Sequence, residues 1–200
     1  IIDLSLSVYP LTDKPSLAVL PFQNLTGDPQ QEYFSDGIAD QLITSLSQAP
    51  YLYVTARTST FAFKANPMQV QEIAAKLGVQ YLLEGSVQRD KDRVRIHVQL
   101  IDGRNGNHIW AETYDRNFSD LFAVQDEITM AVMAVLNVQI TGYATGALKY
   151  SRPTSLNAYE HYLKGLYYHL GRRPEDVKRA RQSFEEAIQI DPNFGRAYTW

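Results

Sequence analysis

The order of hydrophobic and polar positions in the first part of the chain indicates two strand–helix units. A continuous apolar run over 17–20, closed by a proline, is typical of a strand that is buried on both faces. Apolar residues then recur at helical spacing over 34–46. A β-rich stretch over 51–55 and a short helix over 70–77 repeat the unit, and Gly78 suits the left-handed conformation that often ends a helix.

From residue 81 the period of the pattern changes to two, which is typical of half-buried strands. Three segments alternate apolar and polar residues in this way: 81–88, 93–100 and 108–114. A third helix is expected over 121–136, and Ser119 or Asp120 can cap it. The sequence therefore predicts an α/β domain with a mixed sheet and the order β-α-β-α-β-β-β-α, with right-handed crossovers in its first two connections.

The last part of the chain carries no strand signal and predicts a helical hairpin. Helices are expected over 158–170 and 175–190, separated by a Gly-Arg-Arg-Pro break. Small residues that allow close helix packing, aromatic residues that fill the gap, and a proline in the next turn stand at these positions: Gly165, Tyr168, Ala180, Phe184, Ala187 and Pro192. The pattern resembles a tetratricopeptide (TPR) repeat, which implies a concave groove for a protein partner.

Residues 194–200 are expected to begin a second repeat of which only a part is present. Its apolar face would lack the neighbouring repeat that covers such faces in helical arrays. A free edge strand of the sheet would add a second unpaired surface. Both features predict self-association, for example as a homodimer.

The composition narrows the classes of function. The 200 residues carry a formal charge of −3, which leaves no basic footprint for nucleic acid. No run of about 18 apolar residues occurs, so insertion into a membrane is not expected either. The absence of cysteine excludes a disulfide framework, a thiolate metal site and a cysteine nucleophile.

Three carboxylates near the start of the first predicted helix could hold a divalent cation through their oxygen atoms. Asp36 and Asp40 stand four residues apart, with Glu32 one turn earlier. Acidic groups near a helix N-terminus also complement its dipole, and this interpretation is favoured because no second ligand cluster accompanies them. We therefore expect no metal ion and no cofactor.

A second candidate is a contact with a small ligand or a peptide after the second strand. Arg57, Thr58 and Ser59 follow the strand at its carboxyl end, the side where open α/β sheets bind ligands. The alternative is an ordinary turn, in which serine and threonine are common.

A third candidate is the basic hairpin around Arg95 and His97, which could bind an anion or an acidic partner. The alternation places both side chains on the polar face of their strand. A solvated ladder of charges across neighbouring strands, with Glu84 or Glu112 as the partner, is the favoured alternative.

Catalytic residues are not expected in this chain. The four histidines stand on different elements without metal-ligand spacing, and no serine lies in a nucleophile motif. Trp110 and Tyr114 share one face of a strand, where packing is favoured over stacking with bases.

Several short motifs between Pro15 and Leu136 occur in the order of a known domain. They are Pro-Ser-Leu-Ala-Val-Leu-Pro-Phe at 15–22, Glu-Tyr-Phe-Ser-Asp-Gly at 32–37, Ala-Arg-Thr-Ser at 56–59, Leu-Glu-Gly-Ser-Val at 83–87, Gln-Leu-Ile-Asp at 99–102 and Trp-Ala-Glu at 110–112. This part of the chain resembles the TolB-like N-terminal domain of bacterial multidomain proteins. In such proteins the domain often lies between a class III adenylate/guanylate cyclase domain and a TPR array.

The resemblance implies four segments and a regulatory role. A linker over 1–14 would lead from an upstream region into a TolB-like domain over 15–140, and a linker over 141–153 into a TPR array over 154–200. The chain would be the non-catalytic, protein-interacting region of a cytoplasmic, adenylate cyclase-like signalling protein. Two alternatives stay open: a winged-helix transcription regulator, and a periplasmic TolB-like envelope component.

Overall fold

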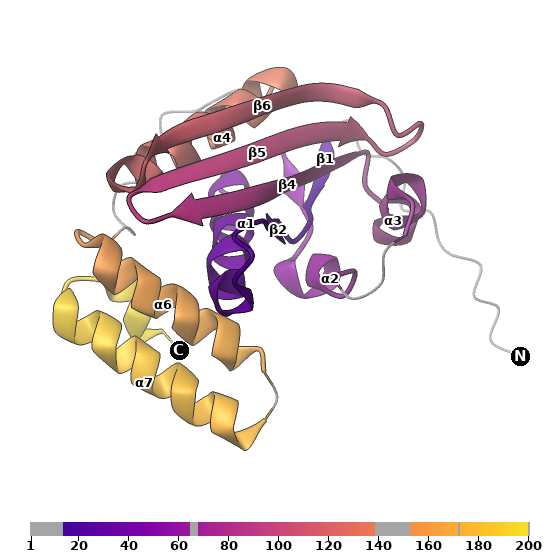
Figure 1. Cartoon of the computed structure of the whole chain (residues 1–200). Coiled ribbons are helices and arrows are strands. Elements are labelled where there is room, and N and C mark those ends of the chain that lie inside the picture. Colours follow the sequence, from indigo (N-terminus) through magenta and orange to yellow (C-terminus); the bar gives the residue numbers. More distant parts are fainter. Residues whose placement is uncertain (1–13, 65–67, 139–152, 172, 200) are drawn as a thin grey trace, which may run out of the picture.

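The computed structural model describes residues 14–64, 68–138, 153–171 and 173–199. Within these residues the chain forms one mixed sheet with helices packed behind and below it in the view of Figure 1. Its strands are β1 (Ser16–Val19), β2 (Gln23–Asn24), β3 (Tyr53–Val54), β4 (Tyr81–Asp90), β5 (Arg93–Asp102) and β6 (His108–Asn117). The order is β3-β1-β4-β5-β6, and β2 pairs with β4. Strand β1 is parallel to β3 and β4, whereas β4, β5 and β6 form an antiparallel meander.

Helices cover one face of the sheet and, beside β1, a part of the other. They are α1 (Glu32–Leu46), α2 (Arg57–Phe61), α3 (Val70–Leu77), α4 (Leu121–Val135), α6 (Leu156–His169) and α7 (Pro174–Ile190). The main core lies between the sheet and the pair α1 and α4, and a smaller core lies between the other face and α3 (Figure 1). The predicted mixed α/β class and the order of its main elements are confirmed.

The burial of β1 follows from its position between two cores. Leu17 and Val19 belong to the core under α1 and α4, whereas Ala18 and Leu20 pack with Ile73 of α3. Because both faces of the strand exclude water, a continuous apolar run is needed there rather than an alternating one. The sequence prediction of a fully buried strand is confirmed.

Three local predictions differ from the structure, and one short strand was not predicted. Arg57 begins α2 and is not part of a turn, since five residues after β3 are helical. The strand predicted over 51–55 is only two residues long, and β2 had no signal in the sequence. Asp120 occupies the N-cap position of α4 but makes no side-chain capping hydrogen bond, because a 3₁₀ turn over 118–120 leads into the helix. Gly78 ends α3 at φ 66°, as expected.

The pair formed by α6 and α7 packs against α1, so that its apolar side chains continue the main core. Leu163 is 2% exposed, and a Cβ atom at Gly37 of α1 would lie 2.6 Å from both of its methyl carbons. Beside this contact, Gln125 Nε2 of α4 donates a hydrogen bond of 3.2 Å to the hydroxyl of Tyr159. The helical pair is therefore docked on the α/β body within the described residues.

The segment after α7 is more buried than expected. Phe194 is 1% exposed and its ring lies 4.9 Å from the ring of Tyr162, and Ala197 is also buried. Within the described part of 194–200, Tyr198 keeps 58% of its surface exposed. The expectation that the apolar face of this whole segment is uncovered was therefore wrong, because the segment folds back onto the helical pair. Self-association stays a prediction.

Asp191 joins the end of α7 to the start of α6. Its Oδ2 atom accepts hydrogen bonds from the amide and the hydroxyl of Thr154, at 2.6 and 2.9 Å, and its Oδ1 atom accepts one from the amide of Asn193. These donors, the Thr154 amide first, hold the pKa of the Asp191 carboxyl below its usual range. The residue after the second helix thus fixes the entry to the first.

Both predicted linkers fall mostly outside the described residues, over 1–13 and 139–152. The four-segment division of the chain stays a prediction. None of the described helices is long and apolar enough to cross a membrane.

Candidate functional site

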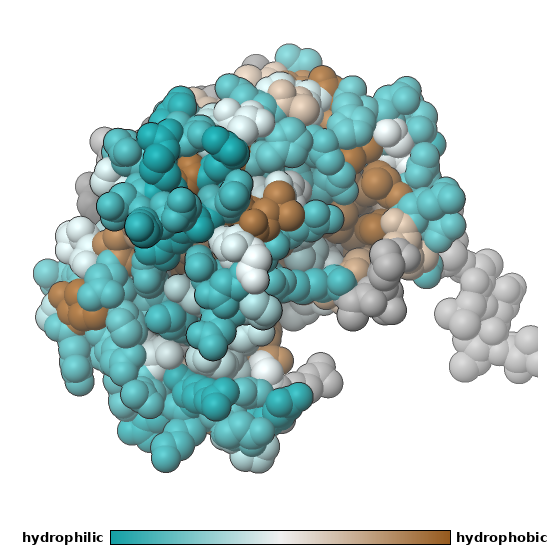
Figure 2. Space-filling view, viewed as in Figure 1, coloured by the Kyte–Doolittle hydropathy of each residue, from teal (hydrophilic) through white to brown (hydrophobic). Residues whose placement is uncertain are grey.

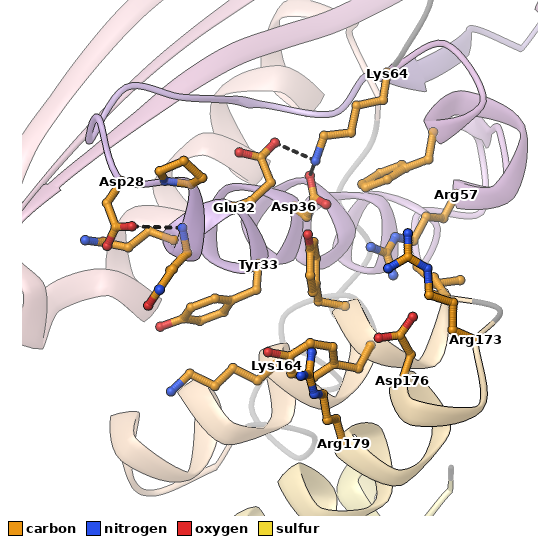
Figure 3. Close-up of a pocket in the computed structure, with 18 of the residues that line it drawn as sticks. Asp28, Glu32, Tyr33, Asp36, Arg57, Lys64, Lys164, Arg173, Asp176 and Arg179 are labelled. Carbon is orange, nitrogen blue, oxygen red and sulfur yellow. Dashed lines mark hydrogen bonds and ion pairs between the residues drawn. The ribbon is translucent and has the colours of Figure 1, made fainter.

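A cleft of about 1680 Å³ lies between the α/β body and the helical pair. One wall is built by the start of α1 together with α2, and the other by α6 and the start of α7 (Figure 3). The docking of α6 on α1 therefore sets the width of the cleft. The residues that line it include Arg57 and Thr58 of the predicted ligand contact, whereas the exposed Ser59 lies outside the lining.

The wall formed by α1 carries a three-membered ion-pair cluster. The ammonium of Lys64 lies 2.6 Å from a carboxylate oxygen of Glu32 and 2.5 Å from one of Asp36 (Figure 3). Burial raises the pKa of Asp36, although the hydrogen bond from Lys64 acts in the opposite direction. Burial alone would lower the pKa of Lys64, but its hydrogen bonds to the two carboxylates outweigh this effect and raise it. Both carboxylates of this wall are thus paired, and the three-membered cluster keeps a formal charge of −1.

Arg57 is held in place at the end of the same wall. Its Nε atom lies 3.5 Å from Asp40, and its guanidinium stacks 4.3 Å from the ring centre of Phe61. Burial raises the pKa of Asp40, while Arg57 acts to lower it. The carboxylates considered as metal ligands therefore pair with Lys64 and Arg57. In the described ranges no group of three or more His, Asp or Glu side chains is arranged to hold a metal ion.

The wall formed by the helical pair carries basic groups over aromatic rings. The ammonium of Lys164 lies 5.3 Å from the ring centre of Tyr33, and the guanidinium of Arg179 lies 5.5 Å from that of Tyr168. Arg173 stands at the start of α7 and also lines the cleft (Figure 3). Burial, followed by the charge of Glu160, raises the pKa of Tyr33, so its ring stays neutral beside Lys164.

The cleft is basic although the chain as a whole is acidic. Of the side chains that line it, seven are basic and four are acidic, against a formal charge of −3 for the chain. Cations at the mouth of a partly enclosed space attract anionic groups, and the neighbouring tyrosines offer flat surfaces for packing. The described lining contains no pair of nucleophile and base and no histidine. The arrangement is suited to binding.

Arg95 and His97, the other predicted contact residues, lie on the exposed face of the sheet and not in the cleft. Both Arg93 and Arg95 pair with Asp115 of β6, and His97 Nδ1 lies 3.0 Å from the hydroxyl of Thr113. The solvated charge ladder is confirmed, but its expected partners were wrong.

The two glutamates proposed for this ladder make other contacts. Glu84 accepts a hydrogen bond from Gln99. Glu112 accepts one of 3.0 Å from the hydroxyl of Tyr114, on the face of β6 that looks towards the helices. Trp110 and Tyr114 pack against the core, as predicted.

The residues of the TPR pattern meet between the two helices. A Cβ atom at Gly165 would lie 2.4 Å from the ring of Phe184, and Ala180 and Ala187 are buried beside it. These contacts explain why small residues alternate with an aromatic one. Tyr168 lines the cleft, and the exposed Pro192 accepts a hydrogen bond from the hydroxyl of Tyr198 through its carbonyl oxygen. The two predicted helices are confirmed, while their assignment to a TPR array stays a prediction.

Sequence reasoning missed the basic wall of the cleft. Lys164, Tyr167 and Tyr168 stand at the i, i+3 and i+4 spacing of one helical face, a signal that was available in the sequence. Figure 2 shows the surroundings of this surface: hydrophilic residues cover most of the helical pair on the side viewed, and hydrophobic residues gather towards α3.

Comparisons with known proteins give three kinds of similarity. A 40% identical relative is a protein of Rhizobium meliloti (strain 1021) named "Putative adenylate cyclase 3"; the match extends over 188 residues, or 94% of this chain, but spans only 32% of the length of that relative. The chain is also similar to the structure of TolB from Acinetobacter baumannii, at 17% identity and a TM-score of 0.48, covering 62% of this chain and 29% of TolB. A lipoprotein of Neisseria meningitidis is similar at 19% identity and a TM-score of 0.45, covering 60% of this chain and 96% of the lipoprotein.

A family model also matches the α/β body. It is described as the second domain of the HilA/YgeH-like transcriptional regulator, and it covers residues 12–131, from the last residues before β1 into α4. The match extends over more than half of the chain and includes the wall of the cleft formed by α1 and α2. The chain therefore belongs to the HilA/YgeH-like transcriptional regulator, second-domain family.

Proposed function

We propose that this chain is the non-catalytic regulatory region of a larger bacterial signalling protein, and that it acts by binding a protein partner. The observation that carries the proposal is the cleft between the α/β body and the helical pair. Its described lining offers charged and aromatic groups for contact but no catalytic set. A cleft closed by two parts of one chain suits a regulatory module, because an occupant touches both parts at once.

The setting favoured here is an adenylate cyclase-like protein with its active site outside this chain. The 40% identity to the Rhizobium meliloti relative supports this setting, and the match spans 32% of the length of that protein. The activity of the whole protein is accordingly a proposal and not a property of these residues.

The helical pair contributes the start of a TPR array in this proposal. The support is the close contact of Gly165 with Phe184 and the burial of Ala180 and Ala187. Further repeats would extend the concave groove for a protein partner. The location that fits a nucleotide-signalling protein is the cytoplasm, and a periplasmic TolB-like component is the alternative.

The test compares the full-length protein with a version that lacks residues 15–200. Conversion of ATP into cyclic AMP is measured for both proteins and for the isolated chain. We expect the truncated protein to retain cyclase activity at a changed level, and the isolated chain to have none. Cyclase activity in the isolated chain, or its absence from the full-length protein, would refute this function.

A second candidate is the regulatory part of a transcription regulator. The match of residues 12–131 to the HilA/YgeH-like second-domain model favours it. In that case the full-length protein would bind a specific DNA site through another domain, and deletion of 15–200 would change its transcriptional output without abolishing its affinity for DNA.

A further inference from the structure

We infer that the cleft between α1, α2 and the helical pair binds an acidic polypeptide segment in an extended conformation. The inference rests on the proposed function, because it names the chemistry of the partner that the regulatory region would recognise. It follows from the distribution of paired and unpaired charges over the two walls, from the size of the cleft, and from its tyrosines.

The two walls differ in how their charges are satisfied. On the wall of α1, Lys64 pairs with both Glu32 and Asp36, so each of these carboxylates already has a cationic partner within the protein. On the opposite wall, Lys164 and Arg179 stack on tyrosine rings, and neither has a carboxylate within ion-pair distance in the described part of the chain.

Arg173 completes this basic wall, and it also has no carboxylate partner among the residues that the structure describes. Asp176 lies between it and Arg179 in the sequence and lines the same wall (Figure 3). One carboxylate among three cations leaves a surplus of positive charge on this wall. An occupant with carboxylates would find partners there that the protein itself does not supply.

The size of the cleft favours a polypeptide over a small molecule. A volume of about 1680 Å³ exceeds the roughly 300–1000 Å³ that is usual for small-molecule pockets. Arg173 and Arg179 are six residues apart, which corresponds to about 9 Å along a helix axis. A peptide in the extended polyproline II conformation rises about 3.1 Å per residue with three residues per turn, so acidic side chains at every third position lie on one face and would reach both guanidinium groups.

Acidic residues within the lining argue against a nucleic acid in the cleft. Asp28 and Asp176 add negative charge to the lining, besides the paired Glu32 and Asp36. A phosphate backbone presents a continuous row of negative charge and would be repelled at these places. A polypeptide can place its carboxylates only where they meet cations. Tyr167, which is 39% exposed, offers an aromatic surface for the apolar groups between them.

The test measures the binding of a labelled acidic peptide to the 200-residue chain. The probe is a fluorescein-labelled peptide with four repeats of Glu-Ala-Ser, and its matched control has Gln in place of each Glu. Fluorescence anisotropy at 50 mM NaCl gives both dissociation constants. We expect the Gln peptide to bind at least about tenfold more weakly, and the binding of the Glu peptide to weaken as NaCl is raised to 300 mM.

Variants of the basic wall identify the binding site. The triple variant Lys164→Gln, Arg173→Gln and Arg179→Gln removes three partly or fully exposed charges, and we expect about a tenfold loss of affinity. The double variant at Arg173 and Arg179 leaves the contact between Lys164 and Tyr33 in place and should lose about threefold. The matched control is Lys178→Gln, an exposed residue of α7 outside the lining, which should change affinity by less than about twofold.

Three results would overturn the inference. The first is equal binding of the Glu and Gln peptides, and the second is an equal effect of the Lys178 variant and of the double variant. The third is a twelve-nucleotide oligo-dT that binds more tightly than the acidic peptide and loses affinity in the same variants, which would assign the cleft to a nucleic acid. If the chain does not bind the acidic peptide but deletion of residues 15–200 still changes the cyclase activity of the full-length protein, only the inference is refuted. The cyclase assay decides the proposed function independently.

Discussion

The contact between Gly37 and Leu163 predicts a reversal in the effect of one substitution. Gly37→Ala adds a methyl group 2.6 Å from both methyl carbons of Leu163, which is 2% exposed and cannot move into solvent. Leu163→Ala removes the side chain that the new methyl group would meet. We therefore expect Gly37→Ala to destabilise the natural chain and to stabilise the Leu163→Ala variant.

The magnitudes follow from the packing at this contact. Leu163→Ala should cost about 3 kcal/mol, as is usual for a buried leucine. Gly37→Ala should cost about 1–3 kcal/mol from overpacking and gain about 1 kcal/mol from helix propensity. In the Leu163→Ala background only the gain remains. The interaction energy of the two substitutions is therefore about 1–3 kcal/mol, with the sign of mutual compensation.

The assay is urea unfolding of the four proteins of this cycle, followed by two probes. Far-ultraviolet circular dichroism reports mainly on the helices. The fluorescence of Trp110, which lies in β6, reports on the α/β body, and a Trp200→Phe background removes the second tryptophan. Because the core is continuous from the sheet to α6, we expect both probes to give one coincident transition. Leu170→Ala, at a 44% exposed residue just after α6, is the matched control and should change the free energy of unfolding by less than about 0.5 kcal/mol.

Two results would refute this reasoning. If the effects of the two substitutions simply add, Gly37 and Leu163 are not in contact. If Leu163→Ala shifts the circular dichroism transition but leaves the Trp110 transition unchanged, the helical pair unfolds separately and does not set the width of the cleft.

Two further predictions concern single charged residues. Because the folded pKa of Asp191 lies below its unfolded value, its contribution is present above the unfolded pKa of about 4 and is lost as the pH falls through the folded pKa. Asp191→Asn should therefore lower the free energy of unfolding by about 1–2 kcal/mol at pH 7 and by progressively less below pH 4. Urea unfolding midpoints measured across this pH range check the prediction. An equal loss of stability at every pH would contradict it. Arg95→Gln removes an exposed ion pair with Asp115 on the sheet, so it should change the free energy of unfolding by less than about 1 kcal/mol. It should also leave the affinity for the acidic peptide unchanged. A clear loss of affinity would place the binding site on the sheet.

The register of β5 and β6 explains why the partner of Arg95 was predicted wrongly. Arg95 lies directly opposite Asp115, whereas Glu112 lies opposite Val98 and shares the helix-facing side of β6 with Tyr114. Alternation along one strand tells which residues share a face, but it does not tell which residue of the next strand comes opposite. The position of the turn and a bulge at 100/101 decide that.

The sequence by itself determined the elements whose burial has a local signature. The apolar run over 17–20 required a strand between two cores, and the alternation over 93–100 required a strand with one exposed face. Gly78 determined the end of α3, because its left-handed conformation is unfavourable for other residues. Small residues such as Gly165 likewise indicated where two helices approach closely. Each of these signals depends on the immediate environment of one segment.

Only the tertiary structure decided the cleft and its charge. Lys64 and Lys164 are a hundred residues apart, and both line the cleft because Leu163 packs against Gly37. The composition, with a net charge of −3, gave no sign of a basic surface, because a whole-chain sum does not show that seven basic and four acidic residues gather around the cleft. Local patterns define elements, but long-range packing selects which charges remain unpaired, and this selection is what leaves a basic wall on the cleft.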